Sequence, residues 1–554
     1  MKNDVCDGQR HETTDNPREG EDANPVPTTD YQIGDFYWDY ADILRGGYGI
    51  SETMYDQRVL ALMALKLMCD NRKLNFSFDY RANFDQGLFD EKSTKKTLLQ
   101  IVRNLTLFNR TSYFQQEKRF NVEESDETAT ESCLSYLNHP LVFDLTSYIA
   151  ELDEVHLEMV LDIYMNKANF VGYPHHAFKD LYEQTVWRMK NSGKRSISGQ
   201  LTGQHFTQKA IVRLMCMASM ARIGDMQKIA VYDPACGTGS MLMESYFCFK
   251  EQLASREIKV FGQELNPQLW MLAKIFLEIS EIPNVIACGN TLTKPAFKEG
   301  FGADGSFEFI VANPPFGVDW KHSYRQVQLE MESAEHSAYF VVKQDGKIIL
   351  PKKSDGQFLF MLHIAKTIVD SRKRGSKAAA AIISSSSLLS SGGRQSSEAL
   401  IRAALFSEGI VNAVLEQPKS MFTNTDIVTH IWFLDSFVAY ETQGRPLKLI
   451  KADNGTDPHF VAHAYPRDKM KNTYNWGNLE RLVYEIVEEG RSTPNSSKLL
   501  PFDDLCTANM AQEMSDISNK KHGAAPRSIA DINGDLVAVA KSLAMELGIY
   551  NDVD

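Results

Sequence analysis

The stretch KIAVYDPACGTGSML, residues 228–242, joins a β-type run to a helical one through a short turn with two glycines. The apolar run before the turn predicts a buried strand, and an apolar segment of helical length, 241–253, follows it. Gly237 and Gly239 let the backbone turn tightly and approach a ligand without a Cβ clash. The stretch therefore predicts a strand-turn-helix unit, for which a plain tight turn is the alternative interpretation.

Strands and helices alternate beyond this unit. Short apolar runs predict further strands at IKVFGQE, NVIACGN, FEFIVAN, AAAAIIS and VNAVLEQP, and helical patterns lie between them, including 269–279 and 358–371. This alternation predicts an α/β, Rossmann-like fold: a doubly wound, mostly parallel sheet covered by helices on both faces. Ligands of such a sheet bind at the carboxyl ends of its strands.

The 554 residues are too many for one hydrophobic core, so we expect several domains. Residues 1–35 are acidic and polar and predict a disordered tail; residues 36–190 predict an all-α N-terminal domain. A polar, glycine-containing connector then opens the α/β domain, expected at 191–440. The C-terminal region, 441–554, holds one strand-like run, PLKLIKA, and helical candidates at 479–489 and 535–547.

Charge and cysteine spacing exclude several classes of protein. The formal net charge of −13 argues against a protein that grips nucleic acid across its whole surface. No apolar stretch reaches the roughly 18–20 residues of a membrane span, and the N-terminus lacks the apolar core of a secretory signal. The eight cysteines form no C-x-x-C pair, so neither a zinc site nor a disulfide framework is indicated, and reduced thiols in a cytoplasm are expected.

An acidic residue at the end of the next strand points to a nucleoside. Glu264 lies about 25 residues after the glycine turn, where a carboxylate can accept hydrogen bonds from a ribose diol. The turn lacks the third glycine of a dinucleotide fingerprint and carries Asp233 at the strand end, which favours S-adenosylmethionine over a pyrophosphate cofactor. Asn290, after the third strand, could bond the adenine edge; a plain polar strand end is the alternative.

The fourth expected strand ends in Asn313-Pro314-Pro315-Phe316. The exocyclic amine of adenine is a poor nucleophile, and the Asn313 side-chain carbonyl and the Pro314 backbone carbonyl can accept its two N–H protons. The prolines stiffen the loop, and Phe316 can stack on the base. Such a base must be flipped out of a duplex. The pattern predicts methyl transfer to an amine, with a simple Pro-Pro strand terminator as the alternative.

The motifs DPACGTGS, GQELNP and NPPFG, in this order, resemble the adenine-N6 DNA methyltransferases. The surrounding chain resembles the modification subunit of type I restriction-modification systems over roughly residues 40–435, including the paired strands near EQPKSMFTNTDIVTHIWFLD. GQHFT, residues 203–207, is similar to the family segment that closes over the cofactor. Gln208 stands where the family usually has proline, and the serine run after AAAAII stands where it commonly has L-P-N-G.

The resemblance implies a class I methyltransferase domain with catalysis at Asn313, Pro314, Pro315 and Phe316. It implies an S-adenosylmethionine site formed by Gln204, His205, Phe206, Thr207, Gln208, Lys209, Asp233, Pro234, Ala235, Gly237, Thr238, Gly239, Ser240, Glu264 and Asn290. No metal is expected. The implied partners are double-stranded DNA with a flipped adenine, a separate specificity subunit docked by the C-terminal helices, a second copy of the chain, and in some systems a restriction subunit, in a prokaryotic cytoplasm.

Two other functions stay open from the residues. A methyltransferase acting on a protein glutamine or an RNA base can use a similar loop, although such enzymes commonly carry tyrosine at the position of Phe316 and lack the helical N-terminal region. A cofactor-binding scaffold of a phage-defence complex that no longer methylates is the other. Residues 320–347 have no counterpart in the family that can be assigned from the sequence.

Overall fold

The computed structural model describes Phe170 and most of residues 207–519, with gaps at 225, 254–255, 299–306, 334–335, 394, 420, 423–426, 437–445, 453–459, 464–470, 475, 489–496, 502–503 and 506–508. The acidic tail expected at 1–35, all of the expected helical domain except Phe170, and the helix expected at 535–547 lie outside the described residues.

A nine-stranded sheet organises the described part of the chain, in the order β13-β10-β8-β9-β7-β4-β1-β2-β3. The strands predicted from the sequence are β1 (Lys228–Asp233), β2 (Glu257–Glu264), β3 (Asn284–Cys288), β4 (Phe309–Ala312), β7 (Ala379–Ser385) and β8 (Val411–Glu416). β1 pairs in parallel with both β2 and β4, and β4 pairs in parallel with β7. The chain therefore reverses direction across the sheet at β1 and β4, where open α/β sheets bind ligands.

Three further strands complete the sheet. β9 (Thr429–Asp435) runs antiparallel between β7 and β8, while β10 (Leu447–Lys451) is parallel to β8 and β13 (Ser497–Leu500) is antiparallel to β10. Every residue of β9 is buried, as expected of a strand with neighbours on both sides. The sheet is thus mostly parallel, as predicted, and it continues past residue 440 because β10 and β13 belong to it.

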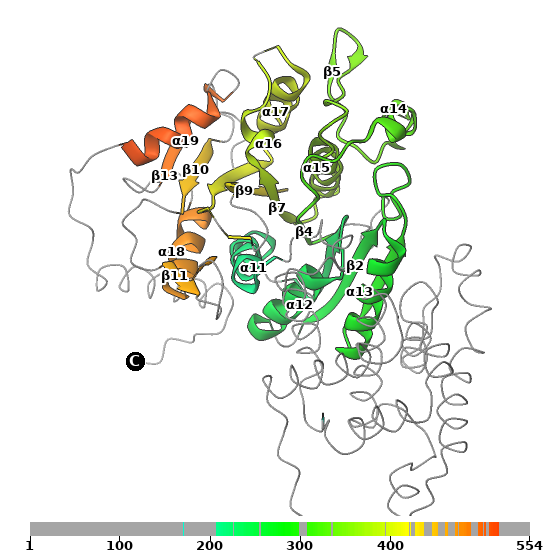
Figure 1. Cartoon of the computed structure of the whole chain (residues 1–554), viewed down its shortest axis with the longest axis vertical. Coiled ribbons are helices and arrows are strands. Elements are labelled where there is room, and N and C mark those ends of the chain that lie inside the picture. Colours follow the sequence, from blue (N-terminus) through cyan, green and yellow to red (C-terminus); the bar gives the residue numbers. More distant parts are fainter. Residues whose placement is uncertain are drawn as a thin grey trace, which may run out of the picture.

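Helices cover both faces of the sheet (Figure 1). One side carries α11 (Lys209–Ile223), α12 (Ser240–Gln252), α13 (Pro267–Ile279) and α18 (Trp476–Val487). The other carries α15 (Gln357–Lys373), α16 (Ser386–Ser390), α17 (Ser397–Ser407) and α19 (Met510–Asn519). A separate pair, β11 (Phe460–His463) and β12 (Lys471–Tyr474), forms its own small sheet. Among the described residues, no helix has the length and apolar character needed to cross a bilayer.

α15 illustrates why this sheet needs two covering layers. Phe358, Leu359, Met361, Leu362 and Ile364 of this helix are all buried, so almost every face of its first turns is apolar. The helix packs against a core that includes residues from β1, β4 and β7. Burying one such large apolar side chain stabilises the fold by roughly 1.5–3 kcal/mol, so this layer contributes strongly to holding the strand ends in place.

The C-terminal end of α18 is held against the sheet by two basic side chains. The Arg222 guanidinium donates to the carbonyl of Val487 at 2.9 Å, and the buried Lys448 ammonium donates to the carbonyls of Glu485 and of Glu488, the latter at 3.0 Å. The last carbonyls of a helix have no partners within it and carry partial negative charge, so cations are favourable there. This arrangement ties the region after residue 440 to the rest of the α/β unit.

The segment between β4 and α15 forms a small structure of its own. It contains a 3-10 turn, η2 (Lys321–Ser323), the helix α14 (Tyr324–Glu332) and a two-stranded hairpin of β5 (Lys343–Gln344) and β6 (Lys347–Ile348). Val327 and Met331 of α14 are buried in the main core. These residues fall in the range for which the sequence offered no counterpart, and they lie beside α15 (Figure 1).

A buried histidine fastens this segment to β1. His363 of α15 lies between the Tyr232 hydroxyl, 3.1 Å from its Nε2, and the carbonyl of Ala338, 2.9 Å from its Nδ1. Because a carbonyl can only accept, Nδ1 carries the proton and Nε2 accepts from the tyrosine. Burial lowers the pKa of His363 to about 4, so the folded protein keeps the ring neutral.

This depressed pKa predicts a loss of stability on mild acidification. In the unfolded chain His363 is protonated below about pH 6.5, whereas in the folded chain it stays neutral down to about pH 4. The contribution of His363 to the free energy of unfolding is therefore complete above pH 6.5 and falls as the pH drops from 6.5 to 4. The full loss is about 3 kcal/mol. Thermal unfolding at pH 7 and at pH 5 measures this loss: the melting temperature should fall more between the two pH values in the unmodified chain than in His363→Gln. Equal drops in both proteins would contradict the assignment.

Candidate active site

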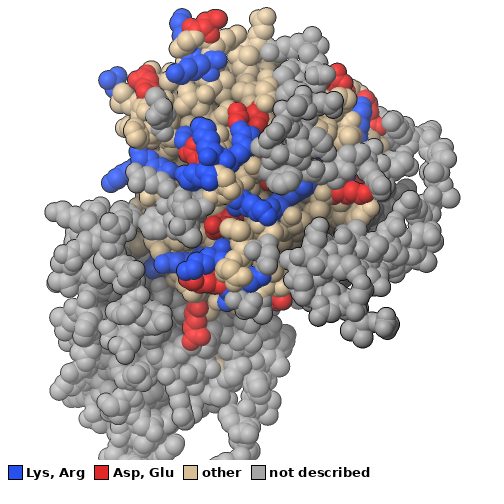
Figure 2. All heavy atoms as spheres, turned by 180° about the vertical axis from the view of Figure 1, so that it is seen from behind, with Lys and Arg blue, Asp and Glu red and all other residues tan. Residues whose placement is uncertain are grey.

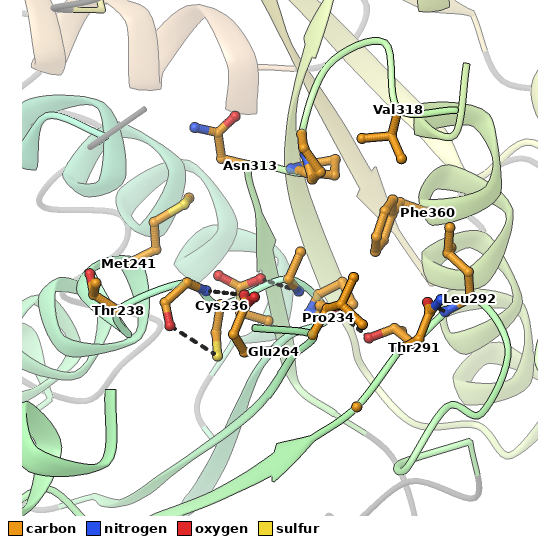
Figure 3. Close-up of a pocket in the computed structure, with 18 of the residues that line it drawn as sticks. Pro234, Cys236, Thr238, Met241, Glu264, Thr291, Leu292, Asn313, Val318 and Phe360 are labelled. Carbon is orange, nitrogen blue, oxygen red and sulfur yellow. Dashed lines mark hydrogen bonds between the residues drawn. The ribbon is translucent and has the colours of Figure 1, made fainter. Parts of the chain in front are cut away.

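A cavity of about 470 Å³ opens at the carboxyl ends of β1, β2 and β4. Its size falls within the range of pockets that hold nucleoside-sized ligands. In Figure 3 the Asn313 loop lies above the residues of the glycine turn, and Val318, Phe360 and Leu292 close one side. The residues predicted for cofactor binding and for catalysis that line this one cavity are Thr207, Asp233, Pro234, Ala235, Gly237, Thr238, Ser240, Glu264, Asn290, Asn313, Pro314 and Pro315.

Two positive φ angles shape the turn between β1 and α12. Gly237 has φ +56° and Gly239, at the N-cap of α12, has φ +76°, a region that side-chain-bearing residues rarely occupy. A Cβ on Gly239 would also lie 3.3 Å from the Cβ of Ala273 in α13. The glycines therefore allow the tight turn that the sequence predicted, and Gly237 and Ser240 of this turn line the cavity.

Glu264 closes this turn from the end of β2. Its Oε2 accepts a hydrogen bond from the Gly237 amide at 2.9 Å, and its Oε1 accepts one from the Asn266 amide at 2.8 Å. Burial raises the pKa of Glu264, and these N–H donors oppose that rise. Each carboxylate oxygen can accept more than one hydrogen bond, so the group retains acceptor capacity toward a ligand in the cavity.

Asp233 is the most deeply buried carboxyl group of the cavity wall. Its side chain is 1% exposed, and its Oδ1 accepts a hydrogen bond from the Ala235 amide at 2.9 Å. Burial is the main cause that raises its pKa to about 8, with a smaller contribution from the negative charge of Glu264. At neutral pH the carboxyl group is therefore mostly protonated until a cation enters the cavity.

Asn290 lines the cavity and also stabilises its own loop. The side-chain Oδ1 of Asn290 accepts a hydrogen bond from the Leu292 amide at 2.9 Å, which is the pattern of an Asx turn. The neighbouring Thr291 hydroxyl donates to the carbonyl of Pro234 at 2.6 Å and joins this loop to the glycine turn. The Asn290 amide nitrogen can donate to an adenine edge, and Oδ1 keeps a second lone pair.

The Asn313 carboxamide is divided between two roles. Its Nδ2 donates to the Thr207 hydroxyl at 3.0 Å, while its Oδ1 is buried and has no hydrogen-bond partner within the described part of the chain. An unpaired buried acceptor is costly, about 1–3 kcal/mol, and such groups collect at functional sites. The carbonyl of Asn313 is thus oriented and left available for an N–H donor.

Four predicted residues with described positions do not line the cavity: Gln208, Lys209, Gly239 and Phe316. Gln208 is the N-cap of α11, and its side-chain amide donates to the carbonyl of Met421 at 2.5 Å, beyond β8. Phe316 is half-buried in the loop after the two prolines. Gln204, His205 and Phe206 lie outside the described residues.

The cavity includes apolar residues that the sequence did not single out. Leu265 directly follows Glu264 and is 64% exposed, which is unusual for a large apolar side chain. Phe360 comes from α15, and Trp320 from the segment after β4. Leu265 could have been suspected from its place beside a strand-end carboxylate, whereas Phe360 and Trp320 reach the cavity only through the tertiary fold.

The serine run at the end of β7 is a structural network. Ser385 caps α16 and receives a hydrogen bond from the Gln357 amide at 3.0 Å, and the Ser387 hydroxyl donates to Asp355 at 2.7 Å. Gln357 in turn accepts from the Ser385 amide at 2.9 Å. These contacts hold the start of α15 next to the end of β7. Among the described residues, no group of histidine, cysteine and acidic side chains could hold a metal ion.

The geometry defines a doubly wound α/β protein with a nucleoside-sized cavity and an Asn-Pro-Pro loop facing its glycine turn. Comparison with known proteins gives the family: the family of N-6 DNA methylases matches residues 174–459. Since this is more than half of the 554 residues, the chain belongs to that family.

Curated relatives and a solved structure agree with this assignment. The chain is 25% identical over 343 residues to the methylase subunit of the type I restriction enzyme MpnII from Mycoplasma pneumoniae, covering 60% of this chain and 55% of the relative. It is 27% identical over 283 residues to the HindI methylase subunit of Haemophilus influenzae, covering 50% of this chain and 55% of the relative. The chain thus spans about half the length of these relatives.

The fold is that of a methyltransferase. The crystal structure of a type I restriction-modification methyltransferase subunit from Streptococcus thermophilus superposes with a TM-score of 0.56 at 17% identity, covering 86% of this chain and 97% of the other. The predicted Rossmann-like methyltransferase fold is therefore confirmed.

Proposed function

We propose that this chain transfers a methyl group from S-adenosylmethionine to the exocyclic N6 amine of adenine in DNA, as the modification subunit of a type I restriction-modification complex. The observation that carries the proposal is the Asn313 carbonyl oxygen, buried without a partner in the described part of the chain at the wall of the cavity. The family assignment and the names of the curated relatives support the same reaction.

The residues of the cavity fit S-adenosylmethionine. Glu264 offers carboxylate oxygens to a ribose diol, and Leu265 offers an exposed apolar surface to a purine ring. The Asp233 carboxyl group lines the cavity, and a positively charged ligand there lowers its pKa and favours its ionised form. This suits a ligand with a sulfonium and an ammonium group. When bound, S-adenosylmethionine supplies a methyl group on a positively charged sulfur.

The Asn313 loop activates the amine. The Asn313 Oδ1 and the Pro314 carbonyl accept the two N–H bonds of the adenine amine, which draws its lone pair out of the ring and toward the methyl donor. Asn313 is oriented beforehand by the Thr207 hydroxyl, so the acceptor needs no rearrangement during the reaction. Phe316 stacks on the flipped base, and the proton leaves to water after transfer.

We further propose that recognition of the DNA sequence is delegated to a specificity subunit, with a second copy of this chain and, in some complexes, a restriction subunit beside it. The net charge of −13 supports this division, because an acidic chain alone attracts DNA weakly. The C-terminal helices after residue 440 are the proposed docking region for the specificity subunit. The proposed place of action is the cytoplasm of a prokaryote.

Transfer of a labelled methyl group from S-adenosylmethionine to genomic DNA tests the proposal. The assay is run with the full chain alone and together with the specificity protein encoded beside it. Label on N6 of adenine that depends on the specificity protein is the expected result. Cofactor binding without label on DNA in either setting would reject the proposal, and label on protein or RNA would point to the other acceptor classes.

The raised pKa of Asp233 predicts how cofactor affinity depends on pH. In the free protein this group is protonated below about pH 8, and a cationic ligand favours its ionised form. Binding therefore releases a proton, and affinity should rise by up to tenfold per pH unit toward pH 8 and level off above it. Calorimetry between pH 6 and 9 measures this rise. A profile that is equally steep in Asp233→Asn would assign the titration to another group.

A further inference from the structure

The segment after β4 that has no assigned counterpart is fastened directly to the cavity wall. Trp320, 2% exposed, lines the cavity, and its backbone N–H and indole N–H donate to the carbonyls of Lys353 and Lys352, each at 2.8 Å. The Gly356 amide donates to the carbonyl of Val318, another lining residue, at 2.9 Å. Lys352 and Lys353 therefore lie next to the part of the cavity wall formed by Val318 and Trp320.

An aromatic stack fixes one of these lysines. Tyr324, the first residue of α14, stacks on Trp320 with ring centroids 5.5 Å apart, and the Lys353 ammonium lies 3.7 Å from the centroid of the Tyr324 ring. A cation over an aromatic face is attracted to it, so the Lys353 side chain is held in place although it is exposed. Arg325, the next residue of α14, is exposed as well.

The β5–β6 hairpin extends the same surface outward. Its turn residues Asp345 and Gly346 have φ +49° and +75°, the pattern of a type I′ turn, which matches the twist of a short hairpin. Lys343 and Lys347 are exposed on its two strands. The hairpin projects beyond α14 and α15 at the top of Figure 1, and Figure 2 shows basic and acidic side chains at the top of the molecule from the other side.

The basic side chains of this surface differ from its acidic ones in how many have a partner of opposite charge. Within the described part of the chain, no ion pair involves the five cations that we call the basic rim: Arg325, Lys343, Lys347, Lys352 and Lys353.

Three acidic neighbours of the rim are engaged, whereas Asp345, in the hairpin turn between Lys343 and Lys347, is exposed. Asp319 pairs with Lys321 at 2.6 Å, Glu330 pairs with Lys298 at 3.4 Å, and Asp355 accepts from the Ser387 hydroxyl. Five rim cations face the single acidic residue of the hairpin, Asp345, so an excess of positive charge remains beside the cavity of a chain whose net charge is −13, and it is open to an anion.

We propose that the basic rim binds the backbone phosphates of DNA that flank the flipped base. This inference rests on the proposed function, since the cavity must first accept a base from a duplex. Lysine and arginine contacts to phosphate fix the position of a duplex and read no sequence. The rim therefore supplies affinity and alignment at the cavity, while sequence recognition stays with the specificity subunit. It also gives the unassigned segment a role.

Paired substitutions test the rim. Lys343→Gln with Lys347→Gln removes the hairpin charges, and Lys352→Gln with Lys353→Gln removes the charges beside Trp320. The control is Lys228→Gln with Lys259→Gln, which changes the net charge equally near the amino ends of β1 and β2, away from the cavity. Each variant is prepared as the full chain with the specificity protein.

Methyl transfer is then measured against the concentration of a 40-base-pair duplex that carries the modified site, at several salt concentrations. Either rim variant should raise the KM for DNA about tenfold and reduce the salt dependence by nearly two phosphate contacts, because each contact adds about 0.9 to the slope. The affinity for S-adenosylmethionine should stay the same in all variants, and the control should leave both quantities unchanged.

The outcomes separate this inference from the function beneath it. Absence of methyl transfer by the unmodified complex rejects the proposed function and the rim together. Transfer with a normal KM and salt slope in both rim variants rejects the rim alone. As a second measurement, DNA should protect Lys343, Lys347, Lys352 and Lys353 from chemical acetylation more than Lys228. Equal protection at all five positions would also overturn the inference.

Discussion

Asn313→Ala should reduce methyl transfer to DNA about 10³-fold while the affinity for S-adenosylmethionine changes little. The side chain supplies an acceptor that is used only as the amine becomes nucleophilic, and removing one such preorganised group from an active site costs about 10²–10³ in rate. The substitution removes a buried oxygen that has no partner among the described residues and also the hydrogen bond from Nδ2 to Thr207, so two opposing effects should leave the net change in stability small.

The control for this substitution is Asn284→Ala, which removes an amide at the amino end of β3, where it accepts from Lys274. It should leave the rate of transfer unchanged. Single-turnover methyl transfer, with cofactor binding measured in parallel by calorimetry, distinguishes the two variants. If Asn313→Ala retained more than a tenth of the activity, the acceptor role assigned to this residue would be wrong.

Substitutions of Thr207 should reduce the rate of methyl transfer by a smaller factor. Its hydroxyl accepts from the Asn313 Nδ2, so Thr207→Val keeps the shape of the residue but removes the contact that orients the carboxamide. We expect a loss of about tenfold in the rate, and Thr207→Ser should restore most of it because the acceptor oxygen returns. A Thr207→Val effect confined to cofactor affinity would show that the residue only closes over the cofactor.

Local sequence patterns predicted the part of the fold that surrounds β1. Each of these patterns predicts one local feature. The apolar run that ends in Asp233 predicts a buried strand, the glycines at 237 and 239 predict positive φ angles, and the acid at 264 predicts a carboxylate at a strand end. The carboxyl ends of parallel strands meet at one edge, so the placement of Asp233, Gly237 and Glu264 in one cavity followed from the fold class.

Long-range contacts were beyond such patterns. Gln208 was expected at the cofactor, yet its side chain bonds the carbonyl of Met421, more than 200 residues away. Phe360 belongs to a helix whose first turns are buried on almost every face, and periodicity cannot tell which face meets a ligand. The same holds for the serines after β7, whose polar run pairs with Gln357 in a neighbouring helix and has no strand-like or helical pattern of its own.

Glu264→Gln should weaken binding of S-adenosylmethionine about 100-fold and leave the fold intact. Hydrogen bonds to a charged group contribute roughly 1.5–3 kcal/mol, and tenfold in affinity corresponds to about 1.4 kcal/mol. The neutral amide keeps one acceptor oxygen, so it cannot hold both the Gly237 and Asn266 amides and still receive a ribose hydroxyl as the carboxylate does.

The matched control lies on the same strand. Glu257→Gln, at the start of β2, removes an exposed carboxylate whose partner is the equally exposed Lys228, and such a surface pair contributes little to stability. Calorimetric titration should find the Glu257→Gln variant unchanged and the Glu264→Gln variant weakened. Burial raises the pKa of Glu264, so in the unmodified chain the affinity should also fall as acid protonates this carboxylate, while Glu264→Gln loses that part of the pH dependence. An affinity within threefold of the unmodified chain for Glu264→Gln would place the ribose elsewhere, because a carboxylate that merely closes the glycine turn can be replaced by an amide at small cost to the ligand.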